Sequence, residues 1–246
     1  MPTRLVHLVI DAIDPPRLGR FWAAALGWEI AHEEPGEVGV EPSGYRYPDP
    51  VAQTLAFVPV TEQKQGKNRV HIDLATTSAE HQAAEIKRLL DLGATKADIG
   101  QGDVPWEVMA DPEGNEFCVA TPLPEYLPAS GLFAAVSIDC ADPAALAGFW
   151  EQAAGWQRTF GNADAVSLRA PEGVGPYLIL LKAPDQKTIK NRMHLDVAPR
   201  STEDLAAAVA TLRAAGATPV DIGQGDVRWH VMADPEGNEF CVLTPR

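Results

Sequence analysis

The order of apolar and polar positions predicts alternating strands and helices from the first residues onward. Residues 5–11 alternate between the two kinds of side chain, as a half-buried β-strand does. Asp14 followed by Pro15 is typical of a helix N-terminus, and an apolar helix follows. Short β-prone segments around 37–41 and 54–58 predict further strands. We interpret this order as a β-α-β-β-β unit, of which the pattern indicates the helix and three strands.

A second unit of the same kind follows. Residues 69–75 alternate as a strand, and Thr77-x-x-Glu80 has the form of a capping box before an apolar helix face. Residues 106–110 and 116–120 are expected to form a hairpin around the turn-rich segment DPEGN. The first half of the chain therefore holds two β-α-β-β-β units.

The second half of the chain repeats the first. Asp98 to Pro122 reads DIGQGDVPWEVMADPEGNEFCVATP, and Asp221 to Pro245 reads DIGQGDVRWHVMADPEGNEFCVLTP. A period of this length indicates tandem domains and not a solenoid. We expect one domain over 1–122, a linker over 123–130 and a second domain over 131–246. Whether the four units pair within each copy or between the copies stays open.

Strand alternation predicts which polar side chains share a sheet face. In the strand 69–75, His71 and Asp73 lie on the face opposite the apolar side chains that pack on the helices. The same reasoning places Glu116 and Cys118 on that face, and His7 on the corresponding face of the first strand. Polar groups on such a face are costly unless they are hydrogen-bonded or functional. The fold class is α+β, with curved, cup-shaped mixed sheets and helices outside.

Composition narrows the function classes. The chain has 246 residues, 46% of them apolar, and a formal net charge of −14. That charge argues against binding nucleic acid, which needs clustered Lys and Arg. No apolar run reaches the length of a membrane span, and MPTRLVHLV lacks the apolar core of a signal peptide. Three cysteines make no disulfide framework, so we expect a cytoplasmic protein, monomeric or homodimeric.

The paired units, the strand VHIDL and the hairpin ADPEGNEFCV resemble the vicinal oxygen chelate superfamily. Glyoxalase I, extradiol dioxygenases, fosfomycin-modifying enzymes and bleomycin-resistance proteins are members. The closest likeness is to small glyoxalase-like domains, here in tandem. The resemblance covers nearly the whole chain and implies the cup-shaped sheet, but one fold carries lyase, isomerase, dioxygenase and binding functions.

The resemblance also implies positions for a divalent metal. Members that use a metal hold it with side chains from the first and last strand of each unit. His7, His71 and Cys118 fall on three of these positions in the first domain, while the remaining one, near Ala56, offers no ligand. Cysteine stands where the family has a carboxylate, and in the second copy Ala135 replaces His7. A divalent metal (Zn, Ni, Fe or Mn) is therefore expected in the first domain only, if at all.

The other candidate residues each carry a functional and a structural interpretation. His71 and His194 are candidates for acid–base chemistry, or are hydrogen-bonded to Asp73 and Asp196 two residues away. Cys118 and Cys241 are either ligand-contacting residues and nucleophilic thiolates beside the histidines, or buried, inert thiols. Trp106 and Trp229 stack on a flat ligand or belong to the core. Glu116 and Glu239 are general bases or solvent-facing edge residues.

Three functions follow from these alternatives. The favoured one is binding or sequestration of a small organic molecule in the cup, without metal or with a degenerate metal site, as in bleomycin-resistance proteins. The second is a metal-dependent lyase or isomerase that acts on a carbonyl substrate in the first domain. The third is a metal-independent isomerase or cyclase that uses His71 with Asp73 as its orienting partner. Whether the protein is an enzyme stays open.

Overall fold

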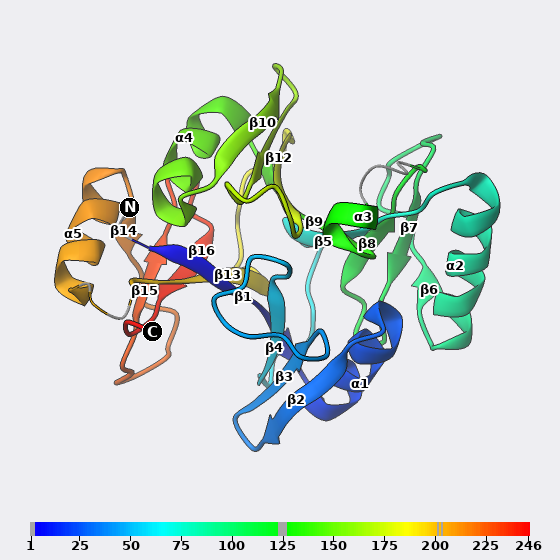
Figure 1. Ribbon diagram of the computed structural model, residues 1–246, viewed down its shortest axis with the longest axis horizontal. Coiled ribbons are helices and arrows are strands. Elements are labelled where there is room, and N and C mark those ends of the chain that lie inside the picture. The colour runs from blue at the N-terminus through cyan, green and yellow to red at the C-terminus, as the bar shows by residue number, and fades with distance from the viewer. Residues whose placement is uncertain (1–2, 123–126, 201, 203) are drawn as a thin grey trace.

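The computed structural model describes residues 3–122, 127–200, 202 and 204–246, and its elements form four β-α-β-β-β units (Figure 1). Unit 1 contains β1 (Arg4–Ala12), α1 (Pro15–Leu26), β2 (Glu29–Glu34), β3 (Glu37–Glu41) and β4 (Thr54–Pro59). Unit 2 contains β5 (Val70–Leu74), α2 (Ala79–Asp91), β6 (Thr95–Lys96), β7 (Glu107–Ala110) and β8 (Glu116–Val119). Unit 3 contains β9 (Phe133–Cys140), α4 (Pro143–Ala154), β10 (Gln157–Gly161), β11 (Ala165–Arg169) and β12 (Tyr177–Lys182). Unit 4 contains β13 (Met193–Ala198), α5 (Leu205–Ala214), β14 (Thr218–Pro219), β15 (His230–Ala233) and β16 (Glu239–Val242).

Local chemistry defines the helix ends. The Asp14 side chain accepts a hydrogen bond from Arg17 N at the start of α1, and Gly27 ends this helix in the left-handed conformation. In α2 the expected capping residue is corrected: Ser78, and not Thr77, is the N-cap, because its hydroxyl accepts from His81 N. Of the expected linker, 123–126 lie outside the described residues and Leu127–Ser130 form the single-turn helix α3.

The units pair between the two copies. Sheet A has the strand order β14-β15-β16-β13-β1-β4-β3-β2 and combines units 1 and 4. Sheet B has the order β10-β11-β12-β9-β5-β8-β7-β6 and combines units 2 and 3. The antiparallel pairs β1–β13 and β5–β9 join the units within each sheet. Each cup is therefore shared by the two sequence repeats, which answers the question that the sequence left open.

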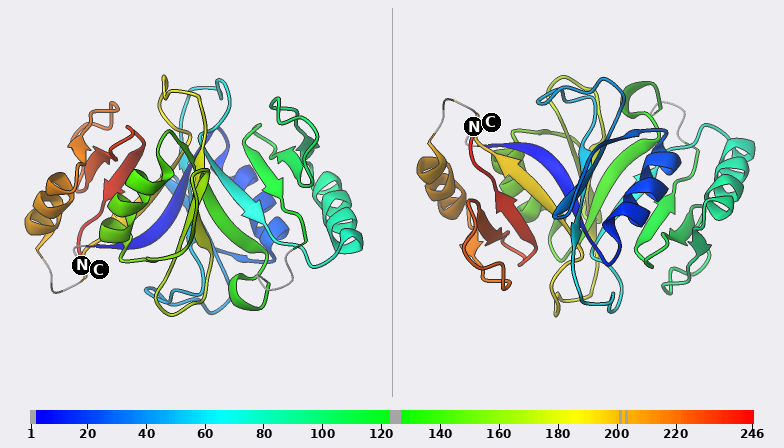
Figure 2. Two further views of the ribbon diagram at one scale, coloured as in Figure 1. Left: turned by 90° about the horizontal axis from the view of Figure 1, so that it is seen from above. Right: turned by 90° about the horizontal axis from the view of Figure 1, so that it is seen from below.

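The helices cover the sheet faces opposite the strand faces that carry His71 and His194, and α2 and α5 lie at opposite ends of the molecule (Figure 2). Their apolar faces and the matching strand faces form one large core. Trp22 on α1 is fully buried against Phe117 of β8, with ring centroids 5.2 Å apart. Trp150 on α4 contacts Phe240 of β16 in the same way, at 5.6 Å. The core thus links the two sheets.

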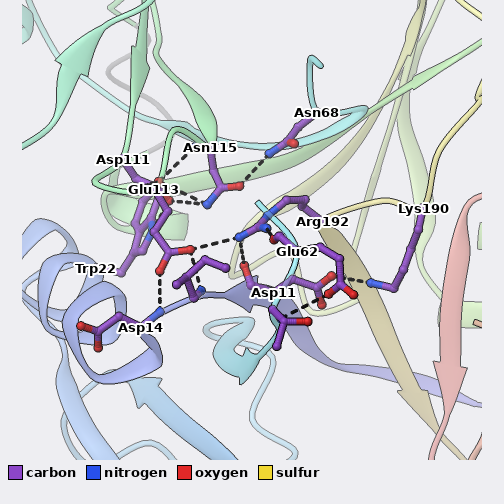
Figure 3. A network of polar contacts seen from close by, with 12 residues as sticks. Asp11, Asp14, Trp22, Glu62, Asn68, Asp111, Glu113, Asn115, Lys190 and Arg192 are labelled. Atoms are coloured by element: carbon purple, nitrogen blue, oxygen red, sulfur yellow. Dashed lines mark hydrogen bonds and ion pairs between the residues drawn. The ribbon is translucent and has the colours of Figure 1, made fainter. Parts of the chain in front are cut away.

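The hairpin segment DPEGN connects three units (Figure 3). The Asp111 carboxylate accepts hydrogen bonds from Glu113 N and Asn115 N within the turn. It also accepts one from the Trp22 indole N–H at 3.2 Å. Glu113 accepts from the backbone N–H groups of Ile13 and Asp14, each at 2.8 Å, and from the Arg192 guanidinium at 3.0 Å. Units 1, 2 and 4 therefore meet at one half-buried carboxylate. Glu236 makes the equivalent contacts with Ala141 N, Asp142 N and Arg69, so the identity of this segment in the two copies has a structural cause.

Candidate functional site

Each sheet carries a cavity on the face that the helices leave free. The cavity of sheet A, here cup A, measures about 620 Å³, and that of sheet B, here cup B, about 520 Å³. Both volumes lie in the range of small-molecule sites, roughly 300–1,000 Å³. The two cups share repeat-equivalent lining residues: Lys190, His194, Asp196, Trp229, Val231 and Cys241 in cup A, and Lys67, His71, Asp73, Trp106, Val108 and Cys118 in cup B.

Cup B contains a cluster of three polar side chains from adjacent strands. His71 and Asp73 lie two residues apart on β5, and β8 places Cys118 opposite Asp73. The His71 Nε2 atom lies 3.5 Å from Asp73 Oδ1. Ser137, on β9 of the other copy, donates a hydrogen bond of 2.5 Å to Asp73 Oδ2. Strand register thus holds the imidazole, the carboxylate and the thiol together, and the second copy supplies a partner.

Cup A contains the equivalent cluster, and its three side chains are more buried than those of cup B. His194 Nε2 lies 3.5 Å from Asp196 Oδ1 and 3.4 Å from the Cys241 sulfur. Among the described residues, His194 Nδ1 and Asp196 Oδ1 are buried without a hydrogen-bond partner. Burial, with a smaller effect of Lys190, lowers the pKa of His194 to about 3. Burial raises the pKa of Asp196 to about 8, so both groups are neutral at pH 7.

The thiols of the two clusters are held in the protonated form. Burial is the main cause, and it raises the pKa of both thiols well above the ordinary range. The neighbouring carboxylate is the second cause. Asp73 raises the pKa of Cys118 further, and Asp196 raises the pKa of Cys241. A protonated, buried thiol is a poor nucleophile. This geometry supports the interpretation of these cysteines as packing and lining residues.

A lysine–aspartate pair lies beside each cluster. Lys190 contacts Asp11 in cup A, and Lys67 contacts Asp139 in cup B, in both cases across the two copies. Sequence reasoning missed these pairs as site elements. A signal was present, because Asp11 and Asp139, like Lys67 and Lys190, occupy equivalent positions of the repeat.

His7 lines cup A and not cup B. Its Nδ1 lies 2.8 Å from the Thr54 hydroxyl, and its Nε2 lies 3.4 Å from Arg246 Nη1. Burial is the largest cause that lowers the pKa of His7 to about 4, and the Arg246 charge adds to it. In sheet A, His7 pairs with Asp196 across β1 and β13. At the equivalent position in sheet B, Ala135 pairs with Asp73 across β9 and β5. Nothing in the repeated sequence pointed to Arg246, which lies just beyond the repeat.

The expected grouping of His7, His71 and Cys118 at one metal site is corrected by this topology. His7 lies on β1 of sheet A, whereas His71 and Cys118 lie on β5 and β8 of sheet B. The reason is the pairing between copies, which puts the first strand of unit 1 beside unit 4. His7 therefore shares a cup with His194 and Cys241.

The predicted glutamates are engaged elsewhere. Glu116 contacts Lys64 Nζ at 2.7 Å and accepts from Asn68 N at 3.1 Å. Glu239 makes the same contacts with Lys187 and Asn191 N, at 2.6 and 3.1 Å. Both are nearly buried and neither lines a cup. Through these contacts, the two glutamates hold the segments that precede β5 and β13 in place.

The donor chemistry of the two clusters is compatible with a divalent metal. The ligand atoms of His71, Asp73 and Cys118 lie within 4.8 Å of one another, and so do those of the equivalent cup A set. Imidazole, carboxylate and thiolate are all zinc ligands, and tetrahedral sites use three of them plus water. The His7 position fits less well, since a guanidinium occupies the neighbourhood of its Nε2 atom.

Comparisons with known proteins agree with this architecture. The model of the glyoxalase-like domain family matches residues 7–120 and again 135–243. Glyoxalase I from Zea mays superposes with a TM-score of 0.66 at 12% identity, over 98% of this chain and 92% of that one. A putative dioxygenase from Bacillus subtilis gives 0.61 at 15% identity, over 98% and 84%. At these identities the structural likeness concerns the fold alone.

No curated protein sequence matches the chain. Among the described residues, no helix combines the length and the apolar character that crossing a bilayer requires. The family assignment therefore rests on the two domain matches, which cover most of the chain, and on the two sheets with their paired units. The chain is a member of the glyoxalase-like domain family, with two such domains in tandem.

Proposed function

We propose that this protein binds small organic molecules in cup A and cup B, as a binding or sequestering protein. The observation that carries the proposal is the duplicated cavity itself. Each cup combines a tryptophan that is about 40% exposed, Trp106 or Trp229, with a nearly buried His–Asp–Cys cluster. An exposed indole offers a face for a flat ligand, and the polar cluster offers a few directed hydrogen bonds.

The state of the clusters favours binding over covalent chemistry. The thiols are protonated, and Glu116 and Glu239 are committed to Lys64 and Lys187. In cup A the neutral imidazole of His194 and the neutral carboxyl of Asp196 present donors and acceptors without a net charge. Such a surface suits an uncharged polar group such as a carbonyl, an amide or a hydroxyl.

The test is a fluorescence titration with small aromatic carbonyl compounds. We expect saturable quenching of tryptophan emission with about one ligand per cup, and a selective loss of the signal of one cup in Trp106→Phe or Trp229→Phe. Trp22→Phe, which changes a core indole, serves as the matched control for the loss of one fluorophore. Absence of saturable binding in folded protein across such a series would overturn the proposal.

A metal-dependent lyase or isomerase is the second candidate, because both clusters fit a divalent ion. His71, Asp73 and Cys118 would hold it in cup B, and a bound ion would supply Lewis-acid polarisation of a substrate carbonyl. Elemental analysis before and after chelation tests this candidate. About one metal per cluster, lost in Cys118→Ser and Cys241→Ser, would favour it; no metal in protein refolded with Zn²⁺, Ni²⁺, Fe²⁺ or Mn²⁺ would exclude it.

The third candidate, metal-independent catalysis by His71, keeps one supporting contact, the 3.5 Å approach of Asp73 to its Nε2 atom. An Asp–His pair of this kind orients an imidazole for proton transfer. The measurement is turnover of a carbonyl ligand found by the titration above. Turnover that His71→Gln abolishes while ligand affinity is kept would favour catalysis over sequestration.

A further inference from the structure

In the described part of the chain, cup A has a lining arginine that cup B lacks. Arg246 lines cup A, where its Nη1 approaches His7 Nε2 at 3.4 Å. The corresponding position of the first copy is Leu123, and the position that corresponds to His7 is Ala135. The two copies therefore share the His–Asp–Cys cluster but differ in the side chains beside it.

Hydrogen bonding indicates how His7 and Arg246 are arranged. The Thr54 hydroxyl lies 3.4 Å from the Val6 carbonyl, to which it donates, so it accepts from His7 Nδ1. The proton of the neutral imidazole is thus on Nδ1, and Nε2 is free to accept from the Arg246 guanidinium. His7 is a positioning residue for Arg246.

Among the described residues, no carboxylate forms an ion pair with the Arg246 guanidinium. In the described chain its guanidinium contacts His7, while its backbone oxygen accepts from Arg4 and its backbone N–H donates to the Pro199 carbonyl. The other charged groups of cup A have partners: Lys190 contacts Asp11, and Glu37 contacts His32 at 2.9 Å. The exposed Arg246 guanidinium is therefore available to bind a ligand.

Cup B is lined by more carboxylates than cations. Its single lining cation, Lys67, contacts Asp139. Asp73 and Asp185 also line this cup, and no arginine does among the described residues. The carboxylates of cup B would repel an anionic ligand, whereas the Arg246 guanidinium of cup A offers it a partner, which gives discrimination between otherwise similar cavities.

We propose that cup A, and not cup B, binds small aromatic carboxylates, with the ligand carboxylate on Arg246 and its ring on Trp229. This inference rests on the proposed function and gives it a ligand class. The guanidinium matches a carboxylate in geometry as well as in charge.

The experiment compares two probes of equal shape, 1-naphthylacetate and its neutral amide, 1-naphthylacetamide, by calorimetry and by the indole N–H signals in NMR spectra. We expect the carboxylate to bind about tenfold more tightly and to shift the Trp229 signal without the Trp106 signal. In Arg246→Gln this preference disappears while the affinity of the amide is kept. His7→Ala, which copies the natural Ala135, reduces it partly. Lys87→Gln on α2 removes a charge that is exposed elsewhere and keeps the preference.

The outcomes separate the two proposals. If neither probe binds, the proposed small-molecule function loses its support together with this inference. If the amide binds to both cups and the carboxylate gains nothing in cup A, or if Arg246→Gln keeps the preference, only the carboxylate inference is overturned. The preference should also fall with added salt, because Arg246 is exposed.

Discussion

Ser137 donates a hydrogen bond of 2.5 Å to Asp73, and Val9 stands at the place of Ser137 in the other sheet. Ser137 pairs with His71 across β5 and β9, just as Val9 pairs with His194 across β1 and β13. One hydroxyl therefore distinguishes the two clusters: Asp73 has a donor from the other copy, whereas Asp196 has a methyl-bearing neighbour and a buried oxygen without a partner.

The first prediction restores that donor in cup A. In Val9→Ser the new hydroxyl should donate to Asp196 and stabilise its ionised form, which lowers the pKa of Asp196 from about 8 by roughly one unit. A ¹³C NMR titration of the side-chain carboxyl measures the change. Val9→Ala is the control, because it removes the bulk of valine without adding a donor. An equal fall of the pKa in both variants would assign the effect to hydration.

The second prediction concerns stability against pH. The pKa of Asp196 is raised by burial from 3.8 to about 8, so the folded protein holds a proton that the unfolded chain releases in this interval. Its contribution to stability is full below pH 3.8 and is lost as the pH rises through 8. Asp196→Asn should remove this loss. The variant should gain stability over the wild type from pH 4 to 8, by at most about 1.4 kcal/mol per pH unit.

Denaturant unfolding at several pH values measures this difference. His194 acts in the opposite direction, because its lowered pKa makes stability fall as the pH drops from 6.5 towards 3. Because His194 Nε2 lies 3.5 Å from Asp196 Oδ1, the comparison is clearest between pH 6.5 and 8, where His194 is neutral in the folded protein and mostly neutral in the unfolded chain. A difference that does not vary between pH 4 and 8 would mean that Asp196 is ionised in the folded protein.

The third prediction tests the junction of units 1, 2 and 4. Glu113→Gln leaves the buried Arg192 guanidinium without its carboxylate, which should lower the free energy of unfolding by about 3 kcal/mol. Thermal and urea unfolding measure the loss. Asp91→Asn is the matched control, since Asp91 pairs with Lys87 on the exposed side of α2, and its change should stay below about 1 kcal/mol. Equal effects of the two substitutions would contradict a connecting role for Glu113.

The units, and the cup face of their strands, were accessible from the sequence because they depend on local chemistry. Alternation along 69–75 correctly predicted that His71 and Asp73 share the face of β5 that lines the cup. Proline after Asp14 correctly predicted the start of α1. These signals need only neighbouring residues, and the repeat supplied each of them twice. The domain boundaries and the roles of the site residues stay predictions.

The pairing of the units was not accessible, because either arrangement buries the same strand faces. β1 presents His7 to a cup whether it lies beside β5 or beside β13, and no local pattern distinguishes the two. The residues that connect the copies already have a role in their own local structure, so the sequence gives no reason to look for a distant partner. Glu113, for example, fits a hairpin turn but also binds Arg192 of the other copy. The metal grouping failed for this reason, and Arg246 was missed because it has no repeated partner.

The last prediction concerns Cys118 and Cys241. Because burial and a neighbouring carboxylate raise the pKa of each thiol, the thiolate is scarce at pH 8 and alkylation should be slow. Iodoacetamide labelling followed by mass spectrometry should modify both sites at least about a hundredfold more slowly than in protein unfolded in urea, which serves as the control. Asp73→Asn removes one cause of the shift and should accelerate labelling of Cys118 while that of Cys241 stays slow. Rapid labelling of either thiol in the folded protein would instead indicate a reactive thiolate, and with it a nucleophilic role that the geometry of the two cups argues against.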